Sequence, residues 1–188
     1  MSDFTDALTA KHKKFIAEQV MFFVATAPKD GRLNLSPKGL DGTFAVINDN
    51  CVAYVDFVGF GNETAAHILD DGRMTIMMNS YNKVPLIMRL YGTGRFAHKG
   101  TEDFDANIHL FDDRHIEGGA VRQIIFLDMT SVQTSCGWGV PIMDKVGERK
   151  TMQNWADKKG ADGVEEYKNT RNTKSIDGLT TGIVPPTE

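Results

Sequence analysis

Short apolar or alternating runs, separated by turn residues, dominate the pattern of this chain. The continuous apolar run at 20–26, VMFFVAT, is typical of a strand that is buried on both faces. The turn signal at 28–31, PKDG, and the alternating residues at 32–36 predict a hairpin partner for it. Pro37 has no N–H to donate, so we expect the pairing of this second strand to end there.

The same reasoning predicts further strands at 43–48, 51–56, 73–79, 86–97 and 121–135. The dipeptide Asp49-Asn50 would join the first two of these as a hairpin. Gly92 and Gly94 lie inside the run 86–97, where paired glycines predict a bulge or a sharp bend. Short connections favour antiparallel pairing, and we therefore expect a small barrel of about seven strands.

Helical patterns lie around these strands, at 2–19, 62–71, 101–113, 151–159 and 162–168. Gly72 stands where a glycine commonly ends a helix. The tail from Thr170 is polar and is expected to be extended. The predicted class is mainly β with peripheral helices. We assign 1–160 to the barrel domain and 161–188 to a C-terminal helix and tail, packed on the same domain or on a dimer partner.

Composition supports a globular protein and argues against several partners. Of the 188 residues, 41% are hydrophobic and 24% charged, which predicts a packed core. The net charge of −4 argues against a general nucleic-acid binder, which needs a basic face. No apolar run reaches the roughly 18 residues of a membrane span, and the N-terminus has no leader-like pattern. We expect a cytoplasmic protein that binds neither membranes nor nucleic acid.

Several common chemistries have no matching pattern. The five histidines are dispersed, and His109 and His115 are six apart, which fits no zinc motif. Cys136 is followed by a glycine-rich loop, but no histidine is marked as its base. A phosphate-binding Gly-Lys-Ser/Thr is absent, and Thr64 stands where a dinucleotide fingerprint needs its third glycine. We expect no metal site.

The stretch 32–64 carries the strongest chemical signal. A hairpin in it is preceded by Asn34, Ser36 and Lys38 and followed by Gly59, Gly61, Asn62 and Thr64. Lys38 offers a point charge, and Ser36 and Thr64 offer hydroxyls. The amides at the start of the predicted helix near Asn62 favour an anion. The sequence therefore predicts an anion pocket at one end of the sheet.

Arg89 is a second candidate for this pocket. It interrupts the apolar run 86–90, LIMRL. A buried arginine without a partner is costly, so we expect it to meet either a bound anion or a carboxylate. Asp56 and Glu102 are the carboxylates that we consider.

Five segments, in this order, resemble the pyridoxamine 5′-phosphate oxidase-like FMN-binding split-barrel superfamily, and most closely its pyridoxamine-phosphate-oxidase-related flavin proteins. They are FFVATAP at 22–28, NLSPKG at 34–39, VDFVGFGNETAAHI at 55–68, RLYGTGRF at 89–96 and CGWGVP at 136–141. Each is weak alone, but their order and spacing are specific, and the resemblance spans roughly 15–155.

The resemblance implies a split-barrel homodimer with FMN in the cleft between the subunits. Lys38 matches a phosphate-binding lysine at the end of the strand that lines the flavin ring. Asp56 and the turn 61–64 match the segment that contacts ribityl and phosphate, and Arg89 matches the arginine before the glycine-bearing strand that crosses the cofactor floor. Trp138 would cover the space over the ring. The implied cofactor-binding set is Asn34, Ser36, Lys38, Asp56, Gly61, Asn62, Thr64, Arg89 and Trp138, with no catalytic residue assigned.

The chain also departs from the type enzymes. Leu33 stands where they carry an arginine, and Arg32 is one position early, which would turn it to the other side of a strand. Their Ser-Arg-Lys segment is absent. These departures argue against pyridoxamine phosphate as substrate and favour an FMN-dependent oxidoreductase acting on an unidentified small molecule. The alternatives are a non-catalytic flavin-binding protein and a haem or deazaflavin binder, for which His67 or His115 would matter.

Overall fold

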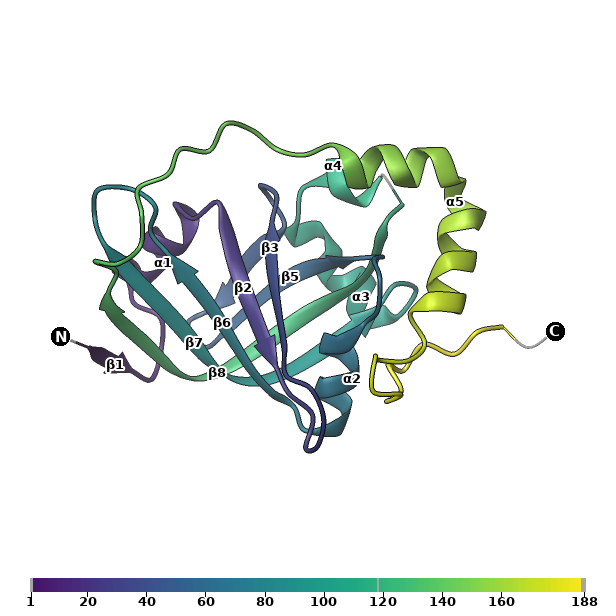
Figure 1. The fold of residues 1–188 in the computed structure, drawn as a ribbon, viewed down its shortest axis with the longest axis horizontal. Coiled ribbons are helices and arrows are strands. Elements are labelled where there is room, and N and C mark those ends of the chain that lie inside the picture. Colours follow the sequence, from purple (N-terminus) through teal and green to yellow (C-terminus); the bar gives the residue numbers. More distant parts are fainter. Residues whose placement is uncertain (1, 118, 187–188) are drawn as a thin grey trace.

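The computed structural model describes residues 2–117 and 119–186, which form one curled antiparallel sheet with helices around it (Figure 1). The strands are β1 Asp3–Thr5, β2 Met21–Thr26, β3 Asn34–Gly39, β4 Phe44–Asn48, β5 Cys51–Phe57, β6 Arg73–Asn79, β7 Leu86–His98 and β8 Val121–Cys136. The helices are α1 Ala10–Ala17, α2 Glu63–Asp70, α3 Glu102–Asn107, α4 Asp113–Ile116 and α5 Thr151–Arg171, with a 3-10 turn, η1, at Ile108–Leu110.

The long strands β7 and β8 form the middle of the sheet. The strand order is β3-β2-β6-β7-β8-β5-β4, and β1 pairs with β8. The register of β7 against β8 shifts between Tyr91 and Gly92, where a Cβ on Gly92 would overlap the backbone carbonyl of Asp128. The bulge predicted from the two glycines is confirmed, and it helps the sheet to curl into a half-barrel.

Both faces of the central strands are covered. Inside the curl, a large core cluster includes Phe22, Tyr54, Ile76, Leu90 and Ile125. On the other face, a second cluster joins residues of β5 and β8 to Phe104 of α3 and to Phe111. This explains why the burial of β5 and of the first half of β8 is continuous rather than alternating.

The N-terminal helix predicted at 2–19 is wrong in its first half. Residues Asp3–Thr5 form β1, which pairs with the end of β8, and the helix begins only at Ala10. Thr9 caps it, because its hydroxyl accepts a hydrogen bond from the backbone N–H of His12. The sequence near the N-terminus has the apolar spacing of a helix, but it does not reveal that its first residues pair with the distant strand β8.

The end of β3 at Pro37 is also wrong. Pairing continues past it, with Phe23 opposite Pro37 and Met21 opposite Gly39. β3 is the edge strand of the sheet, where one side of the backbone needs no partner, so a residue without an N–H is tolerated. The continued pairing brings Lys38 into register with Phe22 on the neighbouring strand.

Two helical predictions differ in detail. The pattern at 101–113 breaks into α3, η1 and the start of α4. The two helices at 151–159 and 162–168 run together as α5, with a kink at Gly160, whose φ is 69°. Ala156 and Val164, on either side of that kink, pack in one cluster with Val58. The division of the chain at 160/161 remains a prediction.

A long connection, residues 137–150, crosses the open side of the curled sheet between β8 and α5 (Figure 1). We call this segment the strap. It contains no helix or strand, and almost all of its residues are exposed. Its position matters because it forms one wall of the pocket described next.

Candidate functional site

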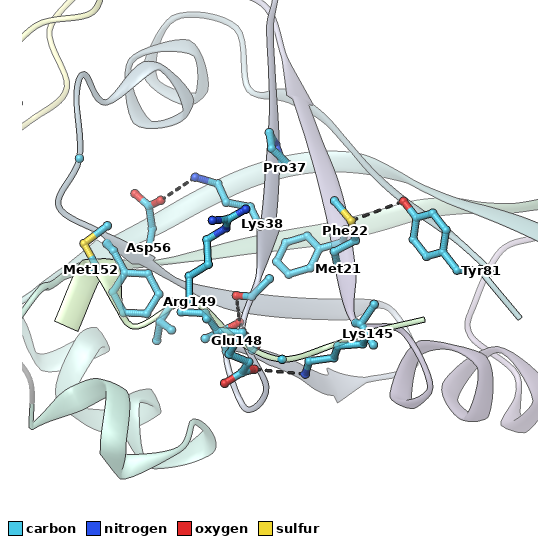
Figure 2. Close-up of a pocket in the computed structure, with 18 of the residues that line it drawn as sticks. Met21, Phe22, Pro37, Lys38, Asp56, Tyr81, Lys145, Glu148, Arg149 and Met152 are labelled. Carbon is cyan, nitrogen blue, oxygen red and sulfur yellow. Dashed lines mark hydrogen bonds and ion pairs between the residues drawn. The ribbon is translucent and has the colours of Figure 1, made fainter. Parts of the chain in front are cut away.

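A cavity of about 680 Å³ lies between the β2–β3 hairpin, the end of β5 and the strap. This volume falls within the range of small-molecule sites, about 300–1,000 Å³. The hairpin contributes Met21, Phe22 and Lys38, β5 contributes Asp56, and the turn after β5 contributes Gly61. Figure 2 shows Met21, Phe22 and Tyr81 on one side of Lys38 and Asp56 on the other.

The orientation of β3 follows from its register with β2. Asn34, Ser36 and Lys38 lie opposite Thr26, Val24 and Phe22, whose side chains are buried. Directly paired residues of antiparallel strands point to the same face, so this polar row faces the inside of the curl. Leu33 and Leu35 are 67% and 60% exposed on the outer side. The edge strand is therefore polar inward and apolar outward, the reverse of the usual arrangement.

Asp56 is the central anion of the pocket floor. Its Oδ1 accepts from Lys38 Nζ at 3.1 Å, and its Oδ2 accepts from Arg122 Nε at 2.8 Å. Burial raises the pKa of the Asp56 carboxyl, but the charges of Arg122 and Lys38 outweigh it and hold that pKa well below its usual range. Asp56 is therefore a carboxylate at neutral pH and orients Lys38 at the edge of the cavity.

A buried amide network extends from Asp56 to the turn after β5. Gln123 Nε2 donates to Asp56 Oδ2 and to Asn62 Oδ1, each at 2.8 Å. Arg122 Nη1 donates to the carbonyl oxygen of Gly61 at 2.7 Å. Because these bonds join β8 to the turn, the floor of the pocket is held from beneath rather than by the turn residues alone.

The C-terminal tail holds the same turn from outside. Asn172 Nδ2 donates to the carbonyl oxygens of Gly59, at 2.8 Å, and of Gly61, at 3.2 Å. The carboxylate of Glu63 accepts from the backbone N–H of Ile176, and Asp177 pairs with Arg32 at 2.9 Å. The tail, predicted to be extended and packed on the same domain or on a dimer partner, contacts the turn of the site in this chain.

The structure brings together three of the nine residues of the predicted set. Lys38, Asp56 and Gly61 line the cavity. Asn62 and Thr64 are buried, at 1% and 5% exposure, and Asn62 reaches Asp56 only through Gln123.

The remaining four residues of that set lie away from the lining. Ser36 Oγ is buried and has no hydrogen-bond partner in the described part of the chain, and Asn34 lies further along β3. Trp138 is 83% exposed on the strap. Arg89 is half-buried and donates to Ser135 Oγ at 3.3 Å; neither Asp56 nor Glu102 pairs with it among the described contacts.

Sequence reasoning missed Arg122 and Gln123. Both interrupt the apolar run of β8, the same signal that drew attention to Arg89. The residues of the strap that line the cavity, among them Met143, Glu148 and Arg149, carried no such signal because the strap is polar and irregular.

The strap is held to the turn that precedes β4 by one ion pair and one hydrogen bond, both to Asp41. Lys145 Nζ lies 2.7 Å from Asp41 Oδ1 and 3.3 Å from Glu148 Oε1, and Glu148 Oε1 accepts from the backbone N–H of Asp41 at 2.6 Å. Met143 adds a backbone bond to the carbonyl oxygen of Tyr81 at 3.0 Å. These contacts place the side chains of the strap over the cavity.

Within residues 2–117 and 119–186, no group of three or more histidine, cysteine, aspartate or glutamate side chains is arranged to hold a metal ion. No helix in the same part of the chain has the length and apolar character needed to cross a membrane.

Comparison with known proteins gives both sequence and fold relatives. The pyridoxamine 5′-phosphate oxidase family protein ustO of Aspergillus flavus is 34% identical to this chain over 196 residues, and the match covers 95% of this chain and 77% of that protein. HupZ from Group A Streptococcus has a TM-score of 0.51 at 21% identity, covering 65% of this chain and 89% of its own.

Two further solved structures share the fold at low identity. A Clostridium acetobutylicum protein of the pyridoxinephosphate oxidase family, related to general stress protein 26, has a TM-score of 0.51 at 8% identity, covering 67% and 86% of the two chains. HutZ, the heme storage protein from Vibrio cholerae, has a TM-score of 0.50 at 16% identity, covering 70% and 97%. The curled half-barrel is thus the split-barrel fold of these proteins.

The sequence profile of the family "Pyridoxamine 5′-phosphate oxidase" matches residues 8–128, which include β2 to β7 and the first half of β8. The strap, α5 and the tail lie outside the matched range. The match covers more than half of the chain and agrees with the A. flavus relative. The chain belongs to the pyridoxamine 5′-phosphate oxidase family.

Proposed function

We propose that this protein binds FMN in the 680 Å³ cavity and uses it in an oxidoreductase reaction on a small molecule. One observation carries the proposal. Lys38 is held at the edge of a largely apolar cavity, on the fold of a flavin-associated family. It offers a cation for a phosphate, and the apolar lining beside it offers a surface for a flat ring.

The lining residues fit both parts of the cofactor. Met21, Phe22, Tyr81 and Met152 provide polarisable or aromatic surface of the kind that packs against a ring (Figure 2). Lys38 is charged and partly exposed, with 27% of its side chain accessible. Asp56 neutralises only part of the positive charge on the floor, because Arg122 and Lys38 both pair with its carboxylate. The floor therefore keeps an excess of positive charge for an anion.

Each part of the chain would have a distinct task. When bound, FMN supplies the electron-transfer chemistry, which no side chain of this cavity could supply alone. Lys38 would hold the phosphate, Asp56 would keep the lysine in position, and the strap would exclude water from the ring. No side chain is assigned as acid or base, and the substrate is left as an unidentified small molecule.

We also propose a homodimer with the cofactor at the interface. The support is apolar surface near the cavity mouth and on the edge strand: Phe60, which lines the cavity, is 89% exposed, and Leu33 and Leu35 are exposed on β3. Trp138 would be available to a second copy. Size-exclusion chromatography with light scattering tests this, and a monomer at concentrations of tens of micromolar would contradict it.

The decisive experiment is a visible spectrum of the purified protein, followed by titration of the colourless fraction with FMN. Flavin absorbance that co-elutes with the protein, or saturable uptake of added FMN, is expected. A colourless protein that takes up no FMN would refute the proposal. Turnover with a reduced nicotinamide and an artificial acceptor then distinguishes an oxidoreductase from a flavin-binding protein without catalysis.

Haem is the second candidate, because HutZ shares the fold. The cavity itself does not favour it. All five histidines lie in the described part of the chain, and none of them lines the cavity. His67 is a buried residue of α2, with its Nδ1 3.0 Å from Thr26 Oγ1. A Soret band that develops on titration with haemin, in place of FMN uptake, would favour this alternative.

A further inference from the structure

Arg149 is a cation of the strap that lines the cavity opposite Lys38. We infer that Arg149 binds the phosphate of the flavin together with Lys38, so that the strap completes the cofactor site after the ligand has entered. This inference rests on the proposed function. Arg149 lies outside residues 8–128, the range of the family match, so the match itself assigns it nothing.

The direction of the side chain is the first support. Figure 2 shows the Arg149 side chain extending from the strap towards Lys38, on the side of the cavity where Lys38 meets Asp56. Two cations directed into one space repel each other unless an anion lies between them. Asp56 is already shared between Lys38 and Arg122, at 3.1 and 2.8 Å, so it is not available to Arg149.

The pairing of its neighbours is the second support. Lys145 pairs with Asp41 and with Glu148. Glu148 also lies 4.0 Å from Arg114, which pairs with Asp112 at 3.0 Å. In the described part of the chain, Arg149 has no carboxylate within ion-pair distance. The basic groups that anchor the strap are thus satisfied within the protein, whereas Arg149 is directed into the cavity.

The attachment of the strap is the third support. The strap is joined to Asp41 by one ion pair, from Lys145, and by one hydrogen bond, from the backbone N–H of Asp41 to Glu148. The ion pair is partly exposed, and such pairs contribute roughly 0–1 kcal/mol. Two backbone bonds, from Met143 to Tyr81 at 3.0 Å and from Gly137 to Pro85 at 3.4 Å, join the strap to the β6–β7 loop on the far side of the cavity. Opening the strap therefore breaks one ion pair and a few hydrogen bonds, and a phosphate bound by Arg149 would hold it closed.

The chemistry of arginine gives the inference its specificity. A guanidinium presents parallel N–H donors that match two phosphate oxygens, whereas Lys38 acts as a point charge. Riboflavin has the same ring as FMN and no phosphate. Arg149 should therefore distinguish the two flavins, while the apolar lining residues Phe22 and Met152 should not.

The test compares FMN and riboflavin binding to the full chain by calorimetry or flavin fluorescence. Arg149→Ala should raise the Kd for FMN about tenfold, the lower end for a charge-assisted hydrogen bond at an accessible site, and leave the Kd for riboflavin unchanged. Arg149→Lys should recover part of the loss. Lys150→Ala is the matched control: it removes the same charge from the next residue, which is exposed and outside the cavity lining.

Limited trypsin digestion gives a second readout that needs no activity. Lys145, Arg149 and Lys150 are exposed cleavage sites on or beside the strap. FMN should slow cleavage at Lys145 and Lys150 in the wild-type protein and not in Arg149→Ala, whereas riboflavin should protect neither protein. Cleavage after Lys158 in α5 serves as the internal reference.

The outcomes separate the two proposals. Wild-type protein that binds FMN with the same Kd as Arg149→Ala would overturn the role of Arg149 and leave the flavin proposal standing. Equal losses of FMN and riboflavin affinity in Arg149→Ala would also overturn it, since the residue would then act on the ring or on the fold. Wild-type protein that binds neither flavin would overturn the proposed function and, with it, this inference.

Discussion

The Nε of Arg122 donates to Oδ2 of Asp56 over 2.8 Å, and the two residues are only 6% and 2% exposed. This buried pair joins β8 to β5 directly beneath the candidate site. Removing one partner of such a pair lowers the stability of the fold by far more than the intact pair contributes to it, because the remaining charge stays buried. The relationship therefore couples the stability of the fold to the charge of the cavity.

Replacing Arg122 with methionine should lower the free energy of unfolding by about 3 kcal/mol, the lower end of the range for an orphaned buried charge. Lys38 and Gln123 still contact the carboxylate of Asp56, which favours that lower end. Urea denaturation at pH 7 measures the change. The double variant with Asp56→Asn should recover part of the loss; a double variant as unstable as the sum of both single changes would contradict this account.

The stability of the wild-type protein should also depend on pH through Asp56. Its pKa is lowered in the folded protein, so the ionised carboxyl stabilises the fold above the unfolded-state pKa of about 3.9. That contribution is lost as pH falls through and below this value. The difference in unfolding free energy between wild type and Asp56→Asn should shrink by about 1.4 kcal/mol per pH unit there. Urea denaturation at pH 6 and pH 3 checks it, and a constant difference would count against it.

Lys38→Ala should weaken FMN binding by about 1.5–3 kcal/mol, the range for a charge-assisted hydrogen bond. The fold should tolerate the change, with a loss of unfolding free energy below about 1 kcal/mol, because Asp56 keeps Arg122 and Lys38 is partly exposed. Calorimetry measures the first effect and urea denaturation the second. Lys29→Ala, an exposed lysine in the β2–β3 turn, is the control. An unchanged dissociation constant in Lys38→Ala would exclude this lysine as a ligand of the phosphate.

Local patterns were sufficient for most of the sheet. The apolar run before Pro28 and the paired glycines at Gly92 and Gly94 each gave the correct element, because apolar runs and bulges depend on nearby residues. The burial of that run on both faces was wrong, since only alternate residues of β2 are fully buried. The first residues of the chain gave the wrong element. Phe4 and Leu8 have helical spacing, but Phe4 lies in a strand that pairs with Gln133, and such distant pairing leaves no trace in a local window.

The site was predictable only in part for the same reason. Lys38 and Asp56 lie within one short stretch and share the cavity. Their partner Arg122 lies 66 residues beyond Asp56, and Asn172 is further still. The strap approaches the cavity only because β8 ends on the opposite side of the curl from α5 (Figure 1). None of these relationships follows from spacing in the sequence.

The bulge in β7 predicts a severe effect of a small substitution. Gly92→Ala should lower the free energy of unfolding by about 3–5 kcal/mol or prevent folding, because the new Cβ would overlap the backbone of Asp128 rather than a movable side chain. Gly139→Ala is the matched control, since nothing lies within 4 Å of its added Cβ. Thermal and urea denaturation compare the two. Equal stability of both variants would show that the sheet can relax at the bulge.

The two cysteines should differ sharply in reactivity. Cys136 is exposed at the end of β8, whereas Cys51 is buried at the start of β5. Burial, reinforced by the nearby Asp128 carboxylate, raises the pKa of the Cys51 thiol to about 11, so only about one molecule in a thousand carries the reactive thiolate at pH 8.

A chromogenic disulfide reagent should therefore label one thiol of the native protein within minutes and the second only in denaturant. Cys136→Ser should abolish the fast phase and leave the slow one, because the substitution lies on exposed surface and does not alter the packing around Cys51. The nearby guanidinium of Arg95, 3.9 Å from the Cys51 sulfur, opposes the rise in pKa. Arg95→Ala should slow native labelling of Cys51 further in the Cys136→Ser background. Fast labelling of Cys51 in the native protein would mean that the start of β5 opens far more readily than its burial implies.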